Sequence, residues 1–142
     1  MYIEIKGEFN MEKKVKLFQI VELNTFIKKL ENEKLPFSLA HKLYSLHNAT
    51  QKDVEFYYNK LQELLDTYAD RDENGKVKMS QDGAQIILKQ DKVEDCQKKM
   101  NELNGCEIDL VFTPLKVEDL DMVEGLNITL NELVALNPFL DE

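Results

Sequence analysis

Residues 38–68 read SLAHKLYSLHNATQKDVEFYYNKLQELLDTY, and this stretch decides the fold. Apolar or semi-apolar residues recur three or four positions apart along all of it: Leu39, Leu43, Leu46, Thr50, Val54, Tyr57, Leu61, Leu64 and Tyr68. This spacing puts them on one helix face, so we predict one long amphipathic helix capped by Ser38. Thr50 and Asp53 resemble a capping box, so two helices broken near Asn48 remain an alternative. The stripe stays in phase there, which favours a continuous or mildly kinked helix.

The residues after this helix predict a hairpin and a second helix. Residues 70–75 have turn chemistry, residues 76–79 and 84–88 have strand patterns, and Asp82-Gly83 is a typical hairpin turn. A shorter helix is expected over residues 91–104, and Gly105 ends it. Residues 38–104 are therefore expected to form a long antiparallel helical hairpin with a β-hairpin at its tip.

The second helix is much shorter than the first, so it can cover only half of it. The apolar positions near Leu39–Thr50 then need another cover. A second copy of the chain in a coiled coil could supply it, and so could the N-terminal helix. A homo-oligomer formed through the long helix is thus one expectation.

Shorter elements flank this unit on both sides. Residues 13–20 are rich in β-formers and predict a strand, and a short helix is expected over residues 21–33, before Leu35-Pro36-Phe37. Residues 107–112 predict a last strand, and Thr129 with Glu132 forms a capping box for a short helix through Leu136. We expect a mostly helical α+β domain over residues 11–142, with the first and last strands paired and residues 139–140 anchored on the body.

Residues 1–10 are set apart from this domain. Residues 6–11 can be encoded by a purine-rich ribosome-binding sequence followed by a start codon, so we expect translation to begin at Met11. Residues 1–10 would then be a translated leader, either disordered or peripheral. They have no signal-peptide core, and no apolar run of the chain approaches the ~20 residues that span a membrane. Two cysteines fit a reducing compartment, so a cytoplasmic protein is expected.

Acidic residues dominate the C-terminal segment. The formal net charge of the chain is -9. Residues 106–142 hold one base, Lys116, and these acids: Glu107, Asp109, Glu118, Asp119, Asp121, Glu124, Glu132, Asp141 and Glu142. Such a segment repels phosphates and argues against direct nucleic-acid binding. We expect Glu118, Asp119, Asp121 and Glu124 either to contact a basic partner protein or to form a solvated acidic surface.

Three consecutive aromatic residues, Phe56, Tyr57 and Tyr58, lie in the long helix. Successive helix residues point 100° apart, so the three side chains cannot all face one core. At least one should lie at the surface, where it could anchor another protein. A wide buried face is the alternative.

The sequence Asp70-x-Asp72-x-Asn74-Gly75 resembles the start of an EF-hand calcium loop. Gln81 replaces the bidentate acid of position 12, and Lys76 and Lys78 place positive charge on the loop. A strand also follows where the motif requires a helix. A calcium module over residues 70–81 is therefore an alternative only, and the same residues suit an ordinary turn.

Signatures of catalysis are missing from the sequence. His41 and His47 are six residues apart and point to different sides of a helix, so they cannot share a metal ion. Cys96 has no evident histidine partner, and no phosphate-binding or nucleophile motif occurs. We expect a protein that is not an enzyme and that needs no cofactor.

Four short segments carry a resemblance: Lys34-Leu35-Pro36, Asp72-Glu73-Asn74-Gly75, Glu107-Ile108-Asp109-Leu110 and residues 133–139, LVALNPF. Their order resembles a group of small uncharacterised proteins of tailed phages and prophages of Gram-positive bacteria. The resemblance implies a phage-encoded protein, but the group has no established activity to transfer. Two functions are expected from it: an inhibitor that binds a host anti-phage defence protein, or an assembly or tail and baseplate accessory protein. The central unit is also similar in outline to a prefoldin subunit, although its second helix is much shorter.

Overall fold

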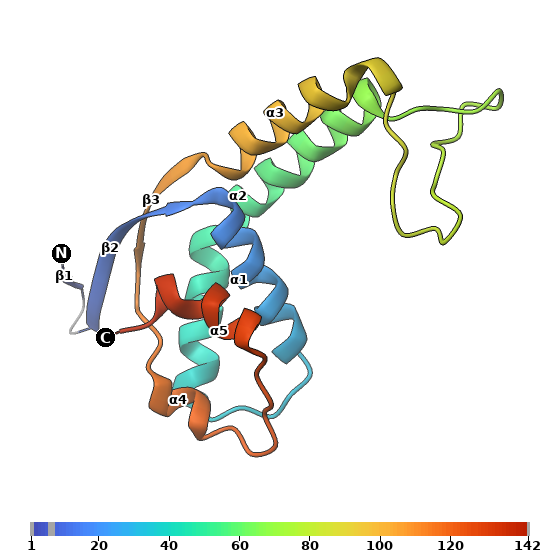
Figure 1. Cartoon of the computed structure of the whole chain (residues 1–142). Helices are drawn as coiled ribbons and strands as arrows, with labels where there is room; N and C mark the ends of the chain where they lie inside the picture. The colour runs from blue at the N-terminus through green and yellow to red at the C-terminus, as the bar shows by residue number, and fades with distance from the viewer. Residues whose placement is uncertain (1, 6–7, 142) are drawn as a thin grey trace.

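The structure, a computed structural model, describes residues 2–5 and 8–141. It is an α+β fold, mostly helical, as the sequence predicted (Figure 1). The elements follow in this order: β1 (Tyr2–Ile5), β2 (Glu8–Lys16), α1 (Leu17–Leu30), α2 (Phe37–Tyr68), α3 (Val93–Asn104), β3 (Glu107–Phe112), α4 (Val117–Asp121) and α5 (Leu130–Leu136). Short 3-10 turns at Gln90–Lys92 and Asn137–Phe139 complete it.

The strands form one antiparallel sheet in the order β1-β2-β3. Lys16 is opposite Glu107 and Met11 is opposite Phe112, so the expected pairing of the first and last strands is confirmed. Strand β1 lies at one edge of this sheet, whereas residues 8–10 belong to the central strand β2 and pair with β1. The start of translation at Met11 stays a prediction.

The boundary between the first strand and the first helix was predicted too late in the chain. Strand β2 ends at Lys16, and residues 17–20 begin α1 instead of ending the strand. Leu17 and Ile20 are fully buried and extend the helical stripe of Leu23 and Phe26 towards the N-terminus. The Gln19 side chain also accepts a hydrogen bond from the Lys16 N–H at 2.8 Å, which caps the helix at this earlier position.

Helix α2 is continuous over 32 residues, so the alternative of two separate helices is wrong. It begins at Phe37, one residue before the predicted cap. The buried Thr50 hydroxyl donates a hydrogen bond to the Leu46 carbonyl oxygen at 2.8 Å. Such bonds back to the preceding turn bend helices. The helix changes direction between its first and second halves in Figure 1.

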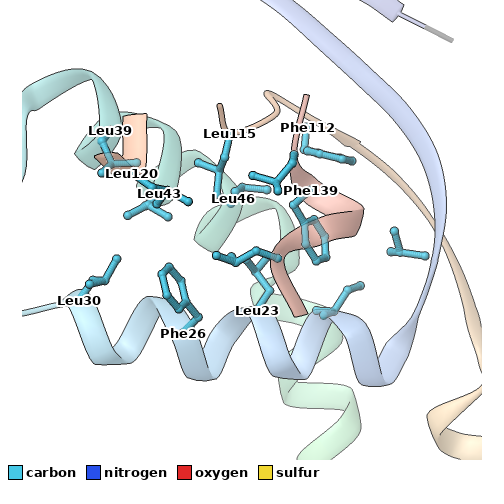
Figure 2. Close-up of a cluster of buried hydrophobic side chains, with 14 of the residues drawn as sticks. Leu23, Phe26, Leu30, Leu39, Leu43, Leu46, Phe112, Leu115, Leu120 and Phe139 are labelled. Carbon is cyan, nitrogen blue, oxygen red and sulfur yellow. The ribbon is translucent and has the colours of Figure 1, made fainter. Parts of the chain in front are cut away.

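The hydrophobic core lies around the first half of α2. Side chains of Leu39, Leu43 and Leu46 face those of α1, and Leu115, Leu120, Phe112 and Phe139 close the cluster (Figure 2). Phe139 is fully buried and Leu140 is nearly so, which confirms both as anchors. Helix α1, rather than a second copy of the chain, thus covers the apolar positions near Leu39–Thr50.

The second half of α2 leaves this body together with α3. We call residues 54–104 the arm, and it projects away from the body in Figure 1. Helix α3 packs beside the second half of α2, and the Tyr68 hydroxyl donates a hydrogen bond to the Asp95 carboxylate. The buried apolar residues that the structure describes in the arm are Val54, Tyr68, Ala69 and Cys96. Two helices can bury only the seam between them, so the core of the arm is thin.

The tip of the arm lacks the two continuous strands of the predicted β-hairpin. Residues 76–79 and 84–88 form single antiparallel bridges and no continuous strand: Arg71 pairs with Val77, Met79 with Ile86 and Ala69 with Leu88. Backbone hydrogen bonds connect residues 70, 78 and 87 in a closed ring: Lys78 N to Asp70 O (2.9 Å), Ile87 N to Lys78 O (2.9 Å) and Asp70 N to Ile87 O (2.8 Å). The backbone hydrogen bonds of the tip are therefore divided among three short segments, around residues 70, 78 and 87, and do not form a ladder between two long strands.

Two tight turns curl the tip. Gly75 and Gly83 have positive φ values of 80° and 72°, which glycine adopts at little steric cost. The Asp82 carboxylate accepts a hydrogen bond from the Ala84 N–H at 3.1 Å and holds the second turn. The Asp-Gly signal thus predicted the turn correctly, and a single antiparallel bridge between Met79 and Ile86 flanks it in place of a continuous ladder.

Candidate protein-binding surface

One groove collects exposed aromatic side chains from segments that are far apart in the sequence. Its volume is about 640 Å³. Residues of β2, of the first turns of α2, of the loop after β3 and of the C-terminal segment line it: Phe9, Phe37, Ser38, His41, Lys42, Thr113, Pro114, Lys116 and Asp141. We call it the aromatic groove. It lies where the sheet meets the N-terminal end of α2.

Two phenylalanines on this groove are open to solvent. Phe37 is 86% exposed and Phe9 is 66% exposed. The Phe37 ring stacks on the His41 ring with centroids 6.3 Å apart and an interplanar angle of 22°. Covering one exposed phenylalanine stabilises a complex by about 1.5 to 3 kcal/mol. Phe9 and Phe37 together therefore offer a substantial apolar surface to a binding partner.

Polar contacts hold the wall of the groove in place. The Lys42 ammonium lies 2.7 Å from Asp119 Oδ2, and the same oxygen accepts the Lys116 N–H at 3.2 Å. Thr113 donates its hydroxyl hydrogen to Asn10 Oδ1 at 2.8 Å and ties the end of β3 to β2. Since these bonds join α2 to α4 and the end of β3 to β2, the groove has a largely preformed shape.

The aromatic triplet predicted as a contact surface does not form one patch. Phe56 and Tyr58 are each 45% exposed, whereas Tyr57 is half-buried and makes an edge contact with Tyr58. Phe56 lines a groove between α2 and α3, and Tyr58 lines a hollow on the α1 side of the helix. The two exposed rings thus serve different surfaces, and their role in binding stays a prediction.

The acidic residues predicted as partner contacts differ in their exposure to solvent. Glu118, Asp121 and Glu124 are exposed on α4 and the loop after it. Asp119 is buried, with 8% exposure, and its carboxylate pairs with Lys42. The prediction of a partner contact at Asp119 conflicts with this burial, because the side chain already attaches α4 to α2.

The structure also separates the aromatic triplet from the acidic residues. Figure 1 shows α4 at the end of the body that lies away from the arm, whereas residues 56–58 belong to the arm. One small partner segment cannot contact both. Any protein that binds the acidic residues therefore uses a different surface from one that binds the triplet.

The residues of the calcium-like loop are engaged within the loop itself. Asp72 Oδ1 accepts the N–H groups of Asn74 at 2.8 Å and of Lys76 at 3.0 Å. Asp70 Oδ2 lies 3.2 Å from the Lys78 ammonium. Among residues 2–5 and 8–141 no group of three or more His, Cys, Asp or Glu side chains is placed to hold a metal ion. These contacts favour the ordinary turn at Asp70, Asp72 and Asn74.

Phe9 and Phe37 were missed because each had another explanation. Phe9 was set aside with the expected leader, and Phe37 was assigned to the break before the long helix. One signal could have identified Phe37: it lies two positions before Leu39, so it points about 200° away from the apolar stripe on a helix. An aromatic residue outside the stripe is expected at the surface.

Comparisons with models of known protein families, with curated proteins and with solved structures find no match to this chain. Within the described part of the chain, each helix is too short or too polar to cross a membrane. Function is therefore inferred from the contacts and exposed surfaces of the chain itself.

Proposed function

We propose that this protein is a non-enzymatic binding module that holds an apolar side chain of another protein in the aromatic groove. One observation carries the proposal: Phe9 and Phe37 stand exposed on a groove of about 640 Å³. Sites of this size, with aromatic walls and a few fixed polar groups, are typical of specific binding. Exposed aromatic residues next to a preformed hollow are also the usual anchors of protein interfaces.

The lining of the groove indicates the chemistry of the partner. The Phe37 and His41 rings offer a flat face on which an aromatic or branched aliphatic side chain can stack. Lys116 and Asp141 carry opposite charges on the same groove. A partner segment with one apolar anchor and polar neighbours fits this lining, and the charged residues would set its orientation.

The resemblance to phage-encoded proteins suggests two kinds of partner. A host anti-phage defence protein would make the protein an inhibitor, and a virion component would make it an assembly or baseplate accessory protein. Glu118, Asp121 and Glu124 could add contacts to a basic surface of either partner. The identity of the bound protein distinguishes the two roles.

The test compares Phe37→Ala with Tyr44→Ala. Tyr44 is a good control because it is also an exposed aromatic residue of α2, at 63% exposure, and it lies outside the aromatic groove. A protein captured from lysate of a candidate host by the wild-type chain should also be captured by the Tyr44 variant and lost with the Phe37 variant. Equal capture by all three chains would overturn the proposal.

Fluorescence can then locate the bound segment. The chain has no tryptophan, so Phe37→Trp provides a single reporter in the groove. Adding the captured protein, or a peptide from it, should shift the emission to shorter wavelengths as water leaves the indole ring. Binding without any emission change would place the contact outside the aromatic groove and contradict the proposal.

A further inference from the structure

A second groove, of about 510 Å³, runs along one side of the arm between α2 and α3. Leu64 and Leu103 lie half-buried in it, and Phe56 is 45% exposed beside them. The arm projects from the body, so in the described part of the chain no third layer covers this side (Figure 1). Two packed helices whose seam stays open on one side are an incomplete bundle, and a further pair of helices would complete it.

The charges on this groove balance each other. Lys60 pairs with Glu63 at 3.1 Å on α2, and Lys99 pairs with Glu102 at 3.9 Å on α3. All four residues line the groove, whereas the whole chain has a net charge of -9. We call the side formed by Phe56, Leu64, Leu103 and these four charged residues the neutral face. At the neutral face two copies of this acidic chain can come into contact without the repulsion that their net negative charges would cause elsewhere.

The order of these charges suits a two-fold arrangement. Lys precedes Glu by three residues on each helix, so an antiparallel copy presents Glu where the first copy presents Lys. A two-fold axis midway between Lys60 and Glu63 sets Lys60 opposite Glu63 of the second copy. The same register sets Phe56 opposite Thr67 of the second copy, and Thr67 also lines the groove.

We propose that two copies of this chain pair through the neutral face and form an antiparallel four-helix bundle from their arms. Each exposed Lys-Glu pair contributes little to the stability of one chain. Across the dimer interface the same four side chains can form pairs between copies, which fixes the register, while Phe56, Leu64 and Leu103 lose contact with water. This proposal is independent of the partner in the aromatic groove.

Charge reversal tests the proposal directly. The variant Lys60→Glu with Lys99→Glu makes the neutral face wholly negative, and Glu63→Lys with Glu102→Lys makes it wholly positive. Each variant alone should sediment as a monomer, with dimerisation weakened by about a hundredfold or more. An equimolar mixture of the two should dimerise again, because the faces are then complementary.

A control variant carries the same change of charge elsewhere on the arm. Lys92 and Lys98 are exposed and lie outside this groove, so Lys92→Glu with Lys98→Glu should dimerise as the wild type does. Circular dichroism checks that each variant is folded. The proposal is overturned if the wild-type chain is monomeric at concentrations of about 100 μM. Failure of the mixture of folded variants to dimerise would overturn it as well.

Discussion

The Lys42 ammonium nitrogen lies 2.7 Å from Asp119 Oδ2 and joins the first half of α2 to α4. The two side chains are only 20% and 11% exposed, so this ion pair is largely withdrawn from solvent. It stands beside the aromatic groove, where it fixes the loop that carries Lys116. An acidic residue that the sequence presents as part of a charged surface is thus a structural contact.

Replacing Asp119 by Asn should destabilise the fold by about 2 to 3 kcal/mol, because the Lys42 charge is left partly buried without its partner. Urea unfolding measures the change. The double variant Lys42→Met with Asp119→Asn should recover part of the loss, and a thermodynamic cycle gives the coupling. A loss below about 0.5 kcal/mol would show that the pair behaves as an exposed one.

Glu132 should make stability depend on acidic pH. The hydrogen bond from the Lys29 ammonium, followed by the Thr129 N–H, lowers the pKa of its carboxyl. A lowered folded-state pKa means that the unfolded chain binds more protons in this range. The stabilisation is therefore present above the ordinary pKa of Glu and is lost as pH falls through the lowered value.

Glu132→Gln isolates this effect, since Gln also suits the third position of a capping box. Urea midpoints measured across the acidic range should fall less steeply with pH in the variant than in the wild type. Parallel curves for the two proteins would contradict the assignment to Glu132.

The two thiols should react at very different rates. Cys106 is exposed, whereas Cys96 is buried, and burial together with the neighbouring Asp95 raises the pKa of the Cys96 thiol. Thiolate is the reactive form, so labelling with a disulfide reagent should show one fast and one slow phase, separated by about tenfold or more. Cys106→Ser should keep only the slow phase, and unfolding in urea should merge the phases of the wild type.

The loop of residues 70–81 should not bind calcium at about 1 mM, a level at which extracellular calcium modules respond. Its carboxylates already accept backbone N–H groups and pair with Lys78. Calorimetric titration measures the heat, with Asp72→Ala as the comparison. A saturable heat that disappears in this variant would revive the calcium alternative.

Periodicity explains what could be predicted from the sequence. The stripe from Leu39 to Tyr68 keeps its phase over the whole helix, and a strand pattern would not reproduce it, so α2 was predicted almost to its ends. The capping box of Thr129 and Glu132 likewise located α5, where the Glu132 N–H donates to Thr129 Oγ1 at 3.1 Å. These signals are local, so they do not depend on distant parts of the chain.

The errors arose where distant contacts decide the structure. Residues 17–20 favour a strand by composition, but burial of Leu17 and Ile20 against the body makes them helical. The tip residues have strand patterns, yet bonds among three segments replace a two-stranded ladder. The aromatic groove combines residues 9, 37, 113 and 141, and no local pattern brings these positions together.

The pairing of β2 with β3 also constrains how the chain can fold during synthesis. Met11 pairs with Phe112, about a hundred residues later, so β2 leaves the ribosome long before its partner strand β3 is synthesised. The hydrophobic core also cannot form before this part of the chain is synthesised, because the buried residues Leu115, Leu136 and Phe139 all follow β3. A chain that stops before residue 107 would expose the apolar face of α1 and a free strand edge, so premature termination should yield aggregation rather than a smaller folded protein.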